Sequence, residues 1–352
     1  MSTSVAATLS IPRNLQRARI LRFSLGVSVA AAVAFAFQWP LFFLAPALTV
    51  FLLAHPPPGP PGHAAWRLGI AILVSFALGL VFAHILLSYP LVYVTFLSLA
   101  LLRINYWVHL GGVRTHALLA LIAILLLPMM TLKHQNLASG MLLSLSFLAS
   151  TGLAALAFLA ATVLVPDPAG CDTMLHSSHS KPADPYAAKI AAIKSTLVLL
   201  PITVLFLSRG WASELLILIF VAIFSLSPQA ASSRAEGSKF VTANLIGGAA
   251  TLLFYWLMVA VPEYHFFVVL MMLATLAFGS MIFSPGPLGG FMMPACIALM
   301  VLIGGSMTEH TGYMDNILIR IVFISLAAIY VVFALAVWDR VIAGKQAGEL
   351  TS

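Results

Sequence analysis

The sequence predicts an all-α polytopic membrane protein with about twelve transmembrane helices in two parallel six-helix repeats, and three observations support this prediction. Of the 352 residues, 62% are hydrophobic and only 8% are charged, whereas an average soluble domain has about 25% charged residues. Apolar runs close to the ~20 residues that a membrane helix needs recur along the chain. The two halves of the chain also match each other at an offset of about 172 residues. We therefore expect the lipid bilayer to surround most of the protein.

Six apolar runs precede a polar stretch at 166–186, and six follow it. The first six spans are expected at about 20–38, 40–54, 67–88, 90–108, 115–132 and 140–165. The second six are expected at about 188–207, 212–227, 240–261, 264–283, 288–305 and 315–339. Two joints, at 38–40 and 88–90, are expected to be tight turns because the residue before a proline disfavours the helical conformation.

The spans and the positive charges together predict the domain organisation and the topology. The expected segments are a cytoplasmic N-terminal segment (1–19), the first repeat (20–165), a cytoplasmic linker (166–186), the second repeat (187–340) and a cytoplasmic tail (341–352). With the N-terminus in the cytoplasm, only Lys133, Arg209 and Arg320 of the 17 Lys and Arg residues fall on the outer side. This positive-inside bias predicts a multi-pass protein of the bacterial inner membrane with both termini in the cytoplasm. The first span is expected to stay uncleaved, because another span follows it at once.

The internal repeat is visible in the loops as well as in the spans. At the offset of 172 residues, HPPPGPPGHAAWR (55–67) aligns with SPQAASSRAEGSK (227–239). The matched pairs include aromatic and cationic positions: Trp39 with Trp211, Arg22 with Lys194, and Arg67 with Lys239. Because six is an even number of spans, both units enter the membrane from the same side and are parallel repeats about an axis along the membrane normal.

A stripe of small residues on the third span predicts close helix packing. Ala71, Ser75, Gly79 and Ala83 recur every four residues and lie on one helix face. Small side chains let helix backbones approach closely within a membrane. Two partners are open: the ninth span, across the repeat axis, or a neighbour within the first repeat.

The sequence contains no motif for an embedded enzyme, and we expect no catalytic residue, metal or cofactor. It lacks H-E-x-x-H, G-x-S-x-G and a phosphate-binding glycine loop. Cys171, His176 and His179 fit no standard zinc spacing, and two cysteines make no disulfide framework. The net charge of +7 comes from Lys and Arg residues that gather on the predicted cytoplasmic side of the membrane. Nucleic acid is therefore not an expected partner.

Polar side chains inside the spans are the candidates for binding, because ionisable groups at membrane depth are costly. In the fourth span, Arg103 either extends its guanidinium to the membrane surface or contacts an anion beside Asn105, Tyr106 and Trp107. The other candidate substrate contacts lie in the ninth and twelfth spans: Asn244, Trp256 and Arg320.

Three titratable side chains are candidates for proton coupling. His84, in the third span, has the side chain whose unperturbed pKa lies nearest neutrality, although a neighbour could equally satisfy it within the core. Glu214 begins the eighth span and either carries protons or caps the helix. Asp315 lies five residues before Arg320 and either pairs with it or takes part in coupling.

The first half contains a basic helix start with RFSLGVSVAAAVAFAFQWPLFFLAPALTVFLLA, a proline-glycine loop, and WRLGIAILVSFALGL. In the second half, SPQAASSRAEGSKFVTANLIGGAATLLFYW looks like the same unit again. In this pattern the chain resembles the FUSC-like family over about residues 20–340. Members of this family are fusaric acid resistance and aromatic carboxylic acid efflux proteins of bacterial inner membranes. This chain is a short form, without the large cytosolic domain of the larger members.

The resemblance implies a transporter that exports small, often aromatic, organic acids. It also implies a periplasmic adaptor and an outer-membrane channel as partners, in a tripartite efflux system driven by the proton gradient. A passive organic-anion channel and a non-transporting membrane subunit are the alternatives. An oligomer is compatible with the sequence.

Overall fold

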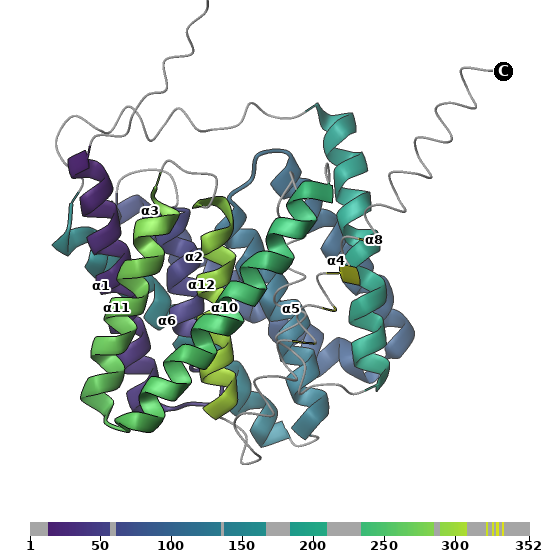
Figure 1. Ribbon diagram of the computed structural model, residues 1–352. Coiled ribbons are helices and arrows are strands. Elements are labelled where there is room, and N and C mark those ends of the chain that lie inside the picture. The colour runs from purple at the N-terminus through teal and green to yellow at the C-terminus, as the bar shows by residue number, and fades with distance from the viewer. Residues whose placement is uncertain are drawn as a thin grey trace, which may run out of the picture.

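The computed structural model is all-α in the residues that it describes. These are residues 13–56, 61–134, 137–166, 184–209, 234–284 and 289–307, together with positions 322, 326, 329, 330 and 333. The helices of the first part are α1 (Arg13–Phe37), α2 (Leu44–Ala54), α3 (Pro61–Leu80), η1 (Val81–Ile85), η2 (Leu86–Ser88), α4 (Pro90–His109), α5 (Arg114–His134) and α6 (Leu137–Leu164). Those of the second part are α8 (Pro185–Arg209), α10 (Arg234–Ala260), α11 (Tyr264–Ile282) and α12 (Gly289–Met307). They form one bundle (Figure 1).

Eight of the described helices are long and apolar enough to cross a membrane. Leu44–Ala54 and Phe291–Gly304 are shorter apolar helices. The predicted span at 212–227 lies outside the described residues, and only five positions of the span at 315–339 are described. The described part therefore supports a multi-pass membrane protein with eight candidate spans.

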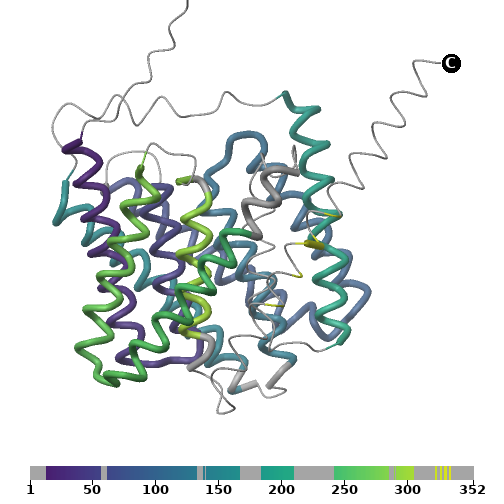
Figure 2. Tube along the Cα trace, viewed as in Figure 1, coloured from purple at the N-terminus to yellow at the C-terminus, as the bar shows by residue number. Residues whose placement is uncertain are grey.

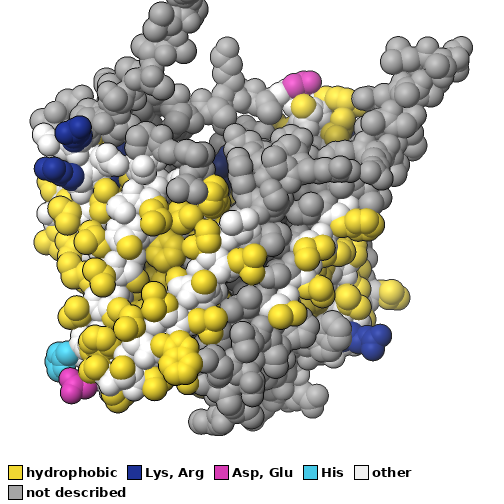
Figure 3. All heavy atoms as spheres, in the orientation of Figure 1, with side chains coloured by type: hydrophobic (Ala, Val, Ile, Leu, Met, Phe, Trp, Pro, Cys, Tyr) yellow, Lys and Arg dark blue, Asp and Glu magenta, His cyan; other side chains and the backbone are white. Residues whose placement is uncertain are grey.

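The surface of the bundle has the pattern of a protein in a bilayer. Hydrophobic side chains cover the middle of the face in Figure 3, while Lys and Arg lie at one end, near the start of α1. At the opposite end, the turn between α10 and α11 carries the exposed Glu263 and His265. Arg209 is the exposed last residue of α8, a helix that runs from the top toward the bottom of the view in Figure 1. A belt of apolar side chains between polar ends is what a lipid-embedded bundle requires.

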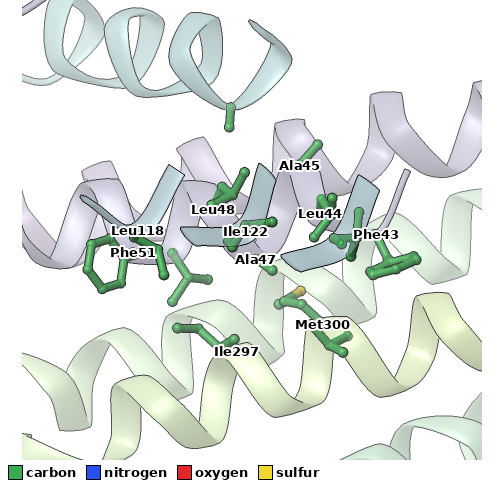
Figure 4. Close-up of a cluster of buried hydrophobic side chains, with 14 of the residues drawn as sticks. Phe43, Leu44, Ala45, Ala47, Leu48, Phe51, Leu118, Ile122, Ile297 and Met300 are labelled. Atoms are coloured by element: carbon green, nitrogen blue, oxygen red, sulfur yellow. The ribbon is translucent and has the colours of Figure 1, made fainter. Parts of the chain in front are cut away.

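The helix α2 forms the centre of the core. Its residues from Leu44 to Leu53 are all buried, and it packs against α1, α6 and α12. Figure 4 shows α2 side chains in one cluster with Leu118 and Ile122 of α5 and Ile297 and Met300 of α12. A helix that is apolar on every face is a buried helix. The predicted second span is thus a core helix of 11 residues.

Small residues set the closest helix approaches. A β-carbon on Gly79 would lie 3.1 Å from Cβ of Ala123, because α3 packs on α5. In α10, a β-carbon on Gly247 would lie 2.5 Å from the backbone oxygen of Ala295 in α12. Of the two partners that the sequence left open for the small-residue stripe, the structure shows the neighbour in the same half of the chain, α5.

Two further pairings join segments that are far apart in the sequence. The first helix, α1, packs along α11, and α4 packs along α8. Figure 2 shows these two pairs on opposite sides of the bundle. Both pairings connect the part of the chain before residue 166 with the part after residue 184.

Candidate functional site

A group of basic side chains surrounds the turn between α4 and α5. We call it the α4–α5 basic cluster, and it comprises His55, Arg67, His109, Arg114 and His116. Arg114 lies close enough to His55 and His109 for its charge to act on both imidazoles, and Arg67 acts in the same way on His116. The positive charge of the cluster therefore comes from Arg67 of α3 and Arg114 of α5, and the three imidazoles lie around it at one end of the bundle.

The turn itself has a tight backbone. Gly111 has a φ of +99°, a conformation that disfavours every residue with a β-carbon. Gly112 lies against Trp107, because a β-carbon there would lie 2.6 Å from the indole ring. The same indole stacks on His116, with 6.2 Å between ring centroids and 13° between planes. This packing holds the start of α5 against the end of α4.

His55 follows α2 and lies outside the spans. Its pKa responds to the positive charge of the cluster. Desolvation by the surrounding chain and, second, the charge of Arg114 lower its pKa to about 4. The side chain is also exposed, and contact with water reduces its desolvation. The repulsion by Arg114 is therefore the cause of the lowered pKa that remains at a hydrated membrane surface. His55 is neutral at pH 7.

Neither Arg67 nor Arg114 forms an ion pair in the described part of the chain. The acidic residues with described side chains are Asp184 and Glu263. The described residues also contain no group of three His, Cys, Asp or Glu side chains placed to hold a metal ion. What this cluster can do chemically is attract and hold an anion.

A line of polar contacts leads from the cluster into the bundle. We call it the α4–α8 polar seam: Asn105 and His109 of α4 face Ser195 and Thr196 of α8. Nδ2 of Asn105 donates to Oγ1 of Thr196 at 3.3 Å, and Nε2 of His109 lies 3.4 Å from Oγ of Ser195. Asn105 and His109 are four residues apart and therefore share one face of α4.

Asn105 is the unusual member of the seam. Its side chain is fully buried, at 0% exposure, and its Oδ1 has no hydrogen-bond partner among the residues that the structure describes. Lys194, which precedes Ser195, is also buried, with 7% exposure. A membrane-spanning bundle thus contains an amide, two hydroxyls, an imidazole and a buried ammonium at neighbouring positions.

The joint between α1 and α11 is built differently. Oγ1 of Thr275 lies 3.1 Å from Oγ of Ser24 and 2.9 Å from Oγ of Ser28. The Thr275 hydroxyl also reaches the carbonyl of Met271 in its own helix at 2.9 Å. The three hydroxyls therefore satisfy one another within the core.

The predicted contacts of α4 fall on different faces of the helix. Arg103 is exposed, on a stripe that also exposes Phe96 and Leu99, so it lies on the face that meets lipid. Tyr106 and Trp107 are half-buried, and Trp107 belongs to the packing of the basic cluster. The structure therefore brings Trp107 to the cluster and leaves Arg103 on the outer face.

The candidates of the second half are spread over α10. Asn244 is buried in this helix, which packs on α12, whereas Trp256 is 60% exposed on the same helix. Glu214, Asp315 and Arg320 lie outside the described residues. The predicted contacts of α10 and α4 do not form one group in the described part.

His84 lies in the π-helical turn η1. Its Nε2 is buried and has no hydrogen-bond partner in the described part of the chain, and its Cε1 would lie 3.1 Å from a β-carbon on Gly140 of α6. Thr131 of α5 borders the same glycine, with Cγ2 at 3.3 Å. π-Helical turns occur often at functional sites.

Sequence reasoning missed most of the seam. Asn105 was considered only as a neighbour of Arg103, although Asn105 and His109 have the four-residue spacing of one helix face. The run Lys194, Ser195, Thr196 places three polar residues in succession within an apolar span. That run could have identified α8 as the second helix of the seam.

The comparisons with known proteins identify one domain. Residues 19–161 match a family model described as a protein of unknown function (DUF2955). The match begins within α1 and ends within α6, and it covers less than half of the chain.

No curated protein and no solved structure matches the chain. The resemblance to FUSC-like proteins is not among the matches. The chain is a multi-pass membrane protein by helix length and hydropathy, and it contains a DUF2955 domain of unknown function.

Proposed function

We propose that the protein is an inner-membrane transporter that exports small organic anions, in particular aromatic carboxylates. The main support is the α4–α5 basic cluster. Its guanidinium and imidazole groups lie at one end of an apolar bundle, and Arg67 and Arg114 form no ion pair in the described part. Positive charge at the end of a low-dielectric bundle raises the local concentration of anions and their rate of association.

The proposed direction is outward. The positive-inside distribution of Lys and Arg supports a cytoplasmic location for the start of α1 and for the α4–α5 turn. Anions would then collect at the cytoplasmic end and leave at the end that carries Arg209. A periplasmic adaptor and an outer-membrane channel, as in FUSC-like efflux systems, are the proposed partners that continue this path.

The proposed architecture is twelve spans in two parallel repeats. Helices α1 and α8 have the same bounds when shifted by 172 residues, and α3 through η2 has nearly the same extent as α10. The packed pairs correspond as well, since α3 with α5 matches α10 with α12, and α4 with α8 matches α11 with α1. The DUF2955 match ends within α6, close to the end of the proposed first repeat.

Hydroxyls at matched positions support the same architecture. Ser24 of α1 bonds to α11, and Thr196 of α8, which is 172 residues later, bonds to α4. In each case the first helix of one proposed repeat packs on the fourth helix of the other. This arrangement would place a path for substrate at the interface of the repeats.

Proton coupling is part of the proposal, and His84 is its candidate carrier. The support is a buried ring nitrogen without a partner in a π-helical turn. We expect His84→Gln to abolish uptake driven by a pH gradient while downhill anion exchange continues. His265→Gln, an exposed histidine at the α10–α11 turn, is the control. Loss of both activities in His84→Gln alone would argue for a structural role.

Labelled benzoate in proteoliposomes tests the function. We expect wild-type protein to move benzoate, and Arg114→Gln to reduce the initial rate about tenfold, because one of the charges that concentrate the anion is lost. Arg17→Gln removes an exposed cation of α1 and serves as the matched control. Movement that is independent of a pH gradient would indicate a channel. No movement by folded wild-type protein would contradict transport and favour a non-transporting subunit.

A further inference from the structure

We infer that the α4–α8 polar seam is the binding site for the carboxylate group of the transported anion and that it is closed in this conformation. The inference rests on the proposed transport function and adds a specific site to it. The site consists of Asn105 and His109 on one helix and Ser195 and Thr196 on the other.

The first argument is the state of the Asn105 amide. The side chain is fully buried within a membrane span, with one amide hydrogen bond and with Oδ1 unpartnered. An unsatisfied polar atom in a membrane interior is costly, because neither water nor lipid replaces the missing partner. A carboxylate cannot donate to Oδ1, but rotation of the amide lets Oδ1 accept from a donor such as the Thr196 hydroxyl and turns the Nδ2 hydrogens toward a ligand.

The second argument is the length of the seam's hydrogen bonds. The contacts of 3.3 Å and 3.4 Å are longer than the usual distances for N–H···O bonds. A carboxylate can replace them with shorter bonds to a charged acceptor, which are about twice as strong as neutral ones. Ligand binding would thus compensate for separating α4 from α8.

The third argument is the chemistry of the donors. The amide N–H of Asn105, the hydroxyls of Ser195 and Thr196, and the imidazole of His109 can all donate to carboxylate oxygens. The terminal oxygen and nitrogen of Asn105 exchange places on rotation of the amide, so its donors can face either wall. The site therefore fits a monocarboxylate.

The fourth argument is the positive potential around the seam. Lys194 is buried one residue before Ser195, and the charge of Arg114 acts on His109. His109 belongs to both the basic cluster and the seam, so the two groups of residues adjoin each other. The seam would be the first site after entry.

The α1–α11 joint supplies the contrast. Its hydroxyls bond to each other at 2.9–3.1 Å, and Nε of Arg22 donates to the carbonyl of Val165 at 2.9 Å. Arg22 is the residue matched with Lys194 in the proposed repeat. The hydroxyls of this joint bond to one another, so we place substrate binding at the α4–α8 joint, where Oδ1 of Asn105 has no partner among the described residues.

Equilibrium binding of labelled benzoate to the full chain in nanodiscs tests the site. We expect Asn105→Leu to weaken binding about tenfold, because it removes a hydrogen bond to a charged ligand. The nearly isosteric Thr196→Val should weaken it several-fold, and it keeps the test valid if Asn105→Leu fails to fold. Thr275→Val at the other joint is the matched control, with an affinity within twofold of wild type. Uncharged benzamide should compete equally poorly in all four proteins.

The outcomes separate the site from the function. An unchanged benzoate affinity in folded Thr196→Val, with transport that still depends on Arg114, overturns the site and leaves the transport function standing. An equal loss of affinity in Thr275→Val also overturns the site, because the effect would then be general. Folded wild-type protein that neither binds nor moves benzoate overturns the function together with the site.

Discussion

Oγ of Ser28 lies 2.9 Å from Oγ1 of Thr275, a hydrogen bond that joins α1 to α11 in the interior of the bundle. Ser24 bonds to the same hydroxyl from the preceding turn of α1. The contact links residues 247 positions apart in the chain. It therefore contributes to the joint between the two parts of the protein rather than to either part alone.

Removal of the Thr275 hydroxyl should weaken this joint. Thr275→Val keeps the shape of the side chain but leaves both serines with fewer partners. Hydrogen bonds between membrane helices are worth about 0.6 kcal/mol on average and about 1.7 kcal/mol at most, so we expect a loss of about 1–2 kcal/mol in the free energy of unfolding. Denaturant titration in mixed micelles measures it. Thr95→Val, which loses only an exposed bond to the carbonyl of Leu91, should change stability little, and equal losses in both variants would contradict the assignment.

The sequence was sufficient to predict the membrane class and most helix positions, because hydrophobic runs of membrane length follow from the need to satisfy every backbone polar group in lipid. The start of the first helix was predicted at residue 20, but α1 begins at Arg13. The early arginines continue the helix at the membrane surface, where charged side chains remain in water. Hydropathy marks only the lipid-embedded part of a helix.

Which helix faces which could not be predicted from periodicity alone. The stripe with Gly79 identified a close contact, yet several helices could have filled it, and the structure places α5 there. Likewise, Arg103 and Asn105 are two residues apart and so lie on different faces of α4, one toward lipid and one toward α8. Arg103 was predicted as a substrate contact because of its charge. The burial of Asn105 makes that residue the candidate for substrate binding instead.

Two glycines of α3 should respond in opposite ways to alanine. A β-carbon on Gly79 would lie 2.5 Å from Cδ1 of Leu127 and 3.2 Å from the carbonyl oxygen of Ala123, so Gly79→Ala should separate α3 from α5. Overpacking of this kind costs about 1–3 kcal/mol. Gly69 has nothing within 4 Å of such an atom, so Gly69→Ala should be neutral or stabilising, because alanine is the better helix former. Thermal melting of the purified variants measures both effects, and a stable Gly79→Ala protein would contradict the tight packing.

The pKa of His55 gives the protein a defined pH dependence. Its pKa is about 4 in the folded protein and about 6.5 in an unfolded chain. Between these values the unfolded state binds more protons, so the folded state should lose stability as the pH falls from 6.5 to 4. Arg114→Gln removes the repulsion, which should raise the pKa of His55 and reduce this loss. Stability measured against pH, together with histidine NMR, checks the result with Arg17→Gln as the control. An unchanged His55 pKa in Arg114→Gln would contradict the proximity of the two side chains.

The topology predicts which ends of the bundle are accessible from outside the cell. We replace Cys171 and Cys296 with serine and place single cysteines at Tyr186, at the start of α8, or at His265, in the first turn of α11; both positions are exposed. The positive-inside distribution places His265 outside and Tyr186 in the cytoplasm. A membrane-impermeant maleimide should therefore label His265→Cys in right-side-out vesicles, whereas Tyr186→Cys should react only after the vesicles are opened. The reverse labelling pattern would show that the protein has the opposite orientation in the membrane. The α4–α5 basic cluster would then face outward, and the proposed export direction would become uptake.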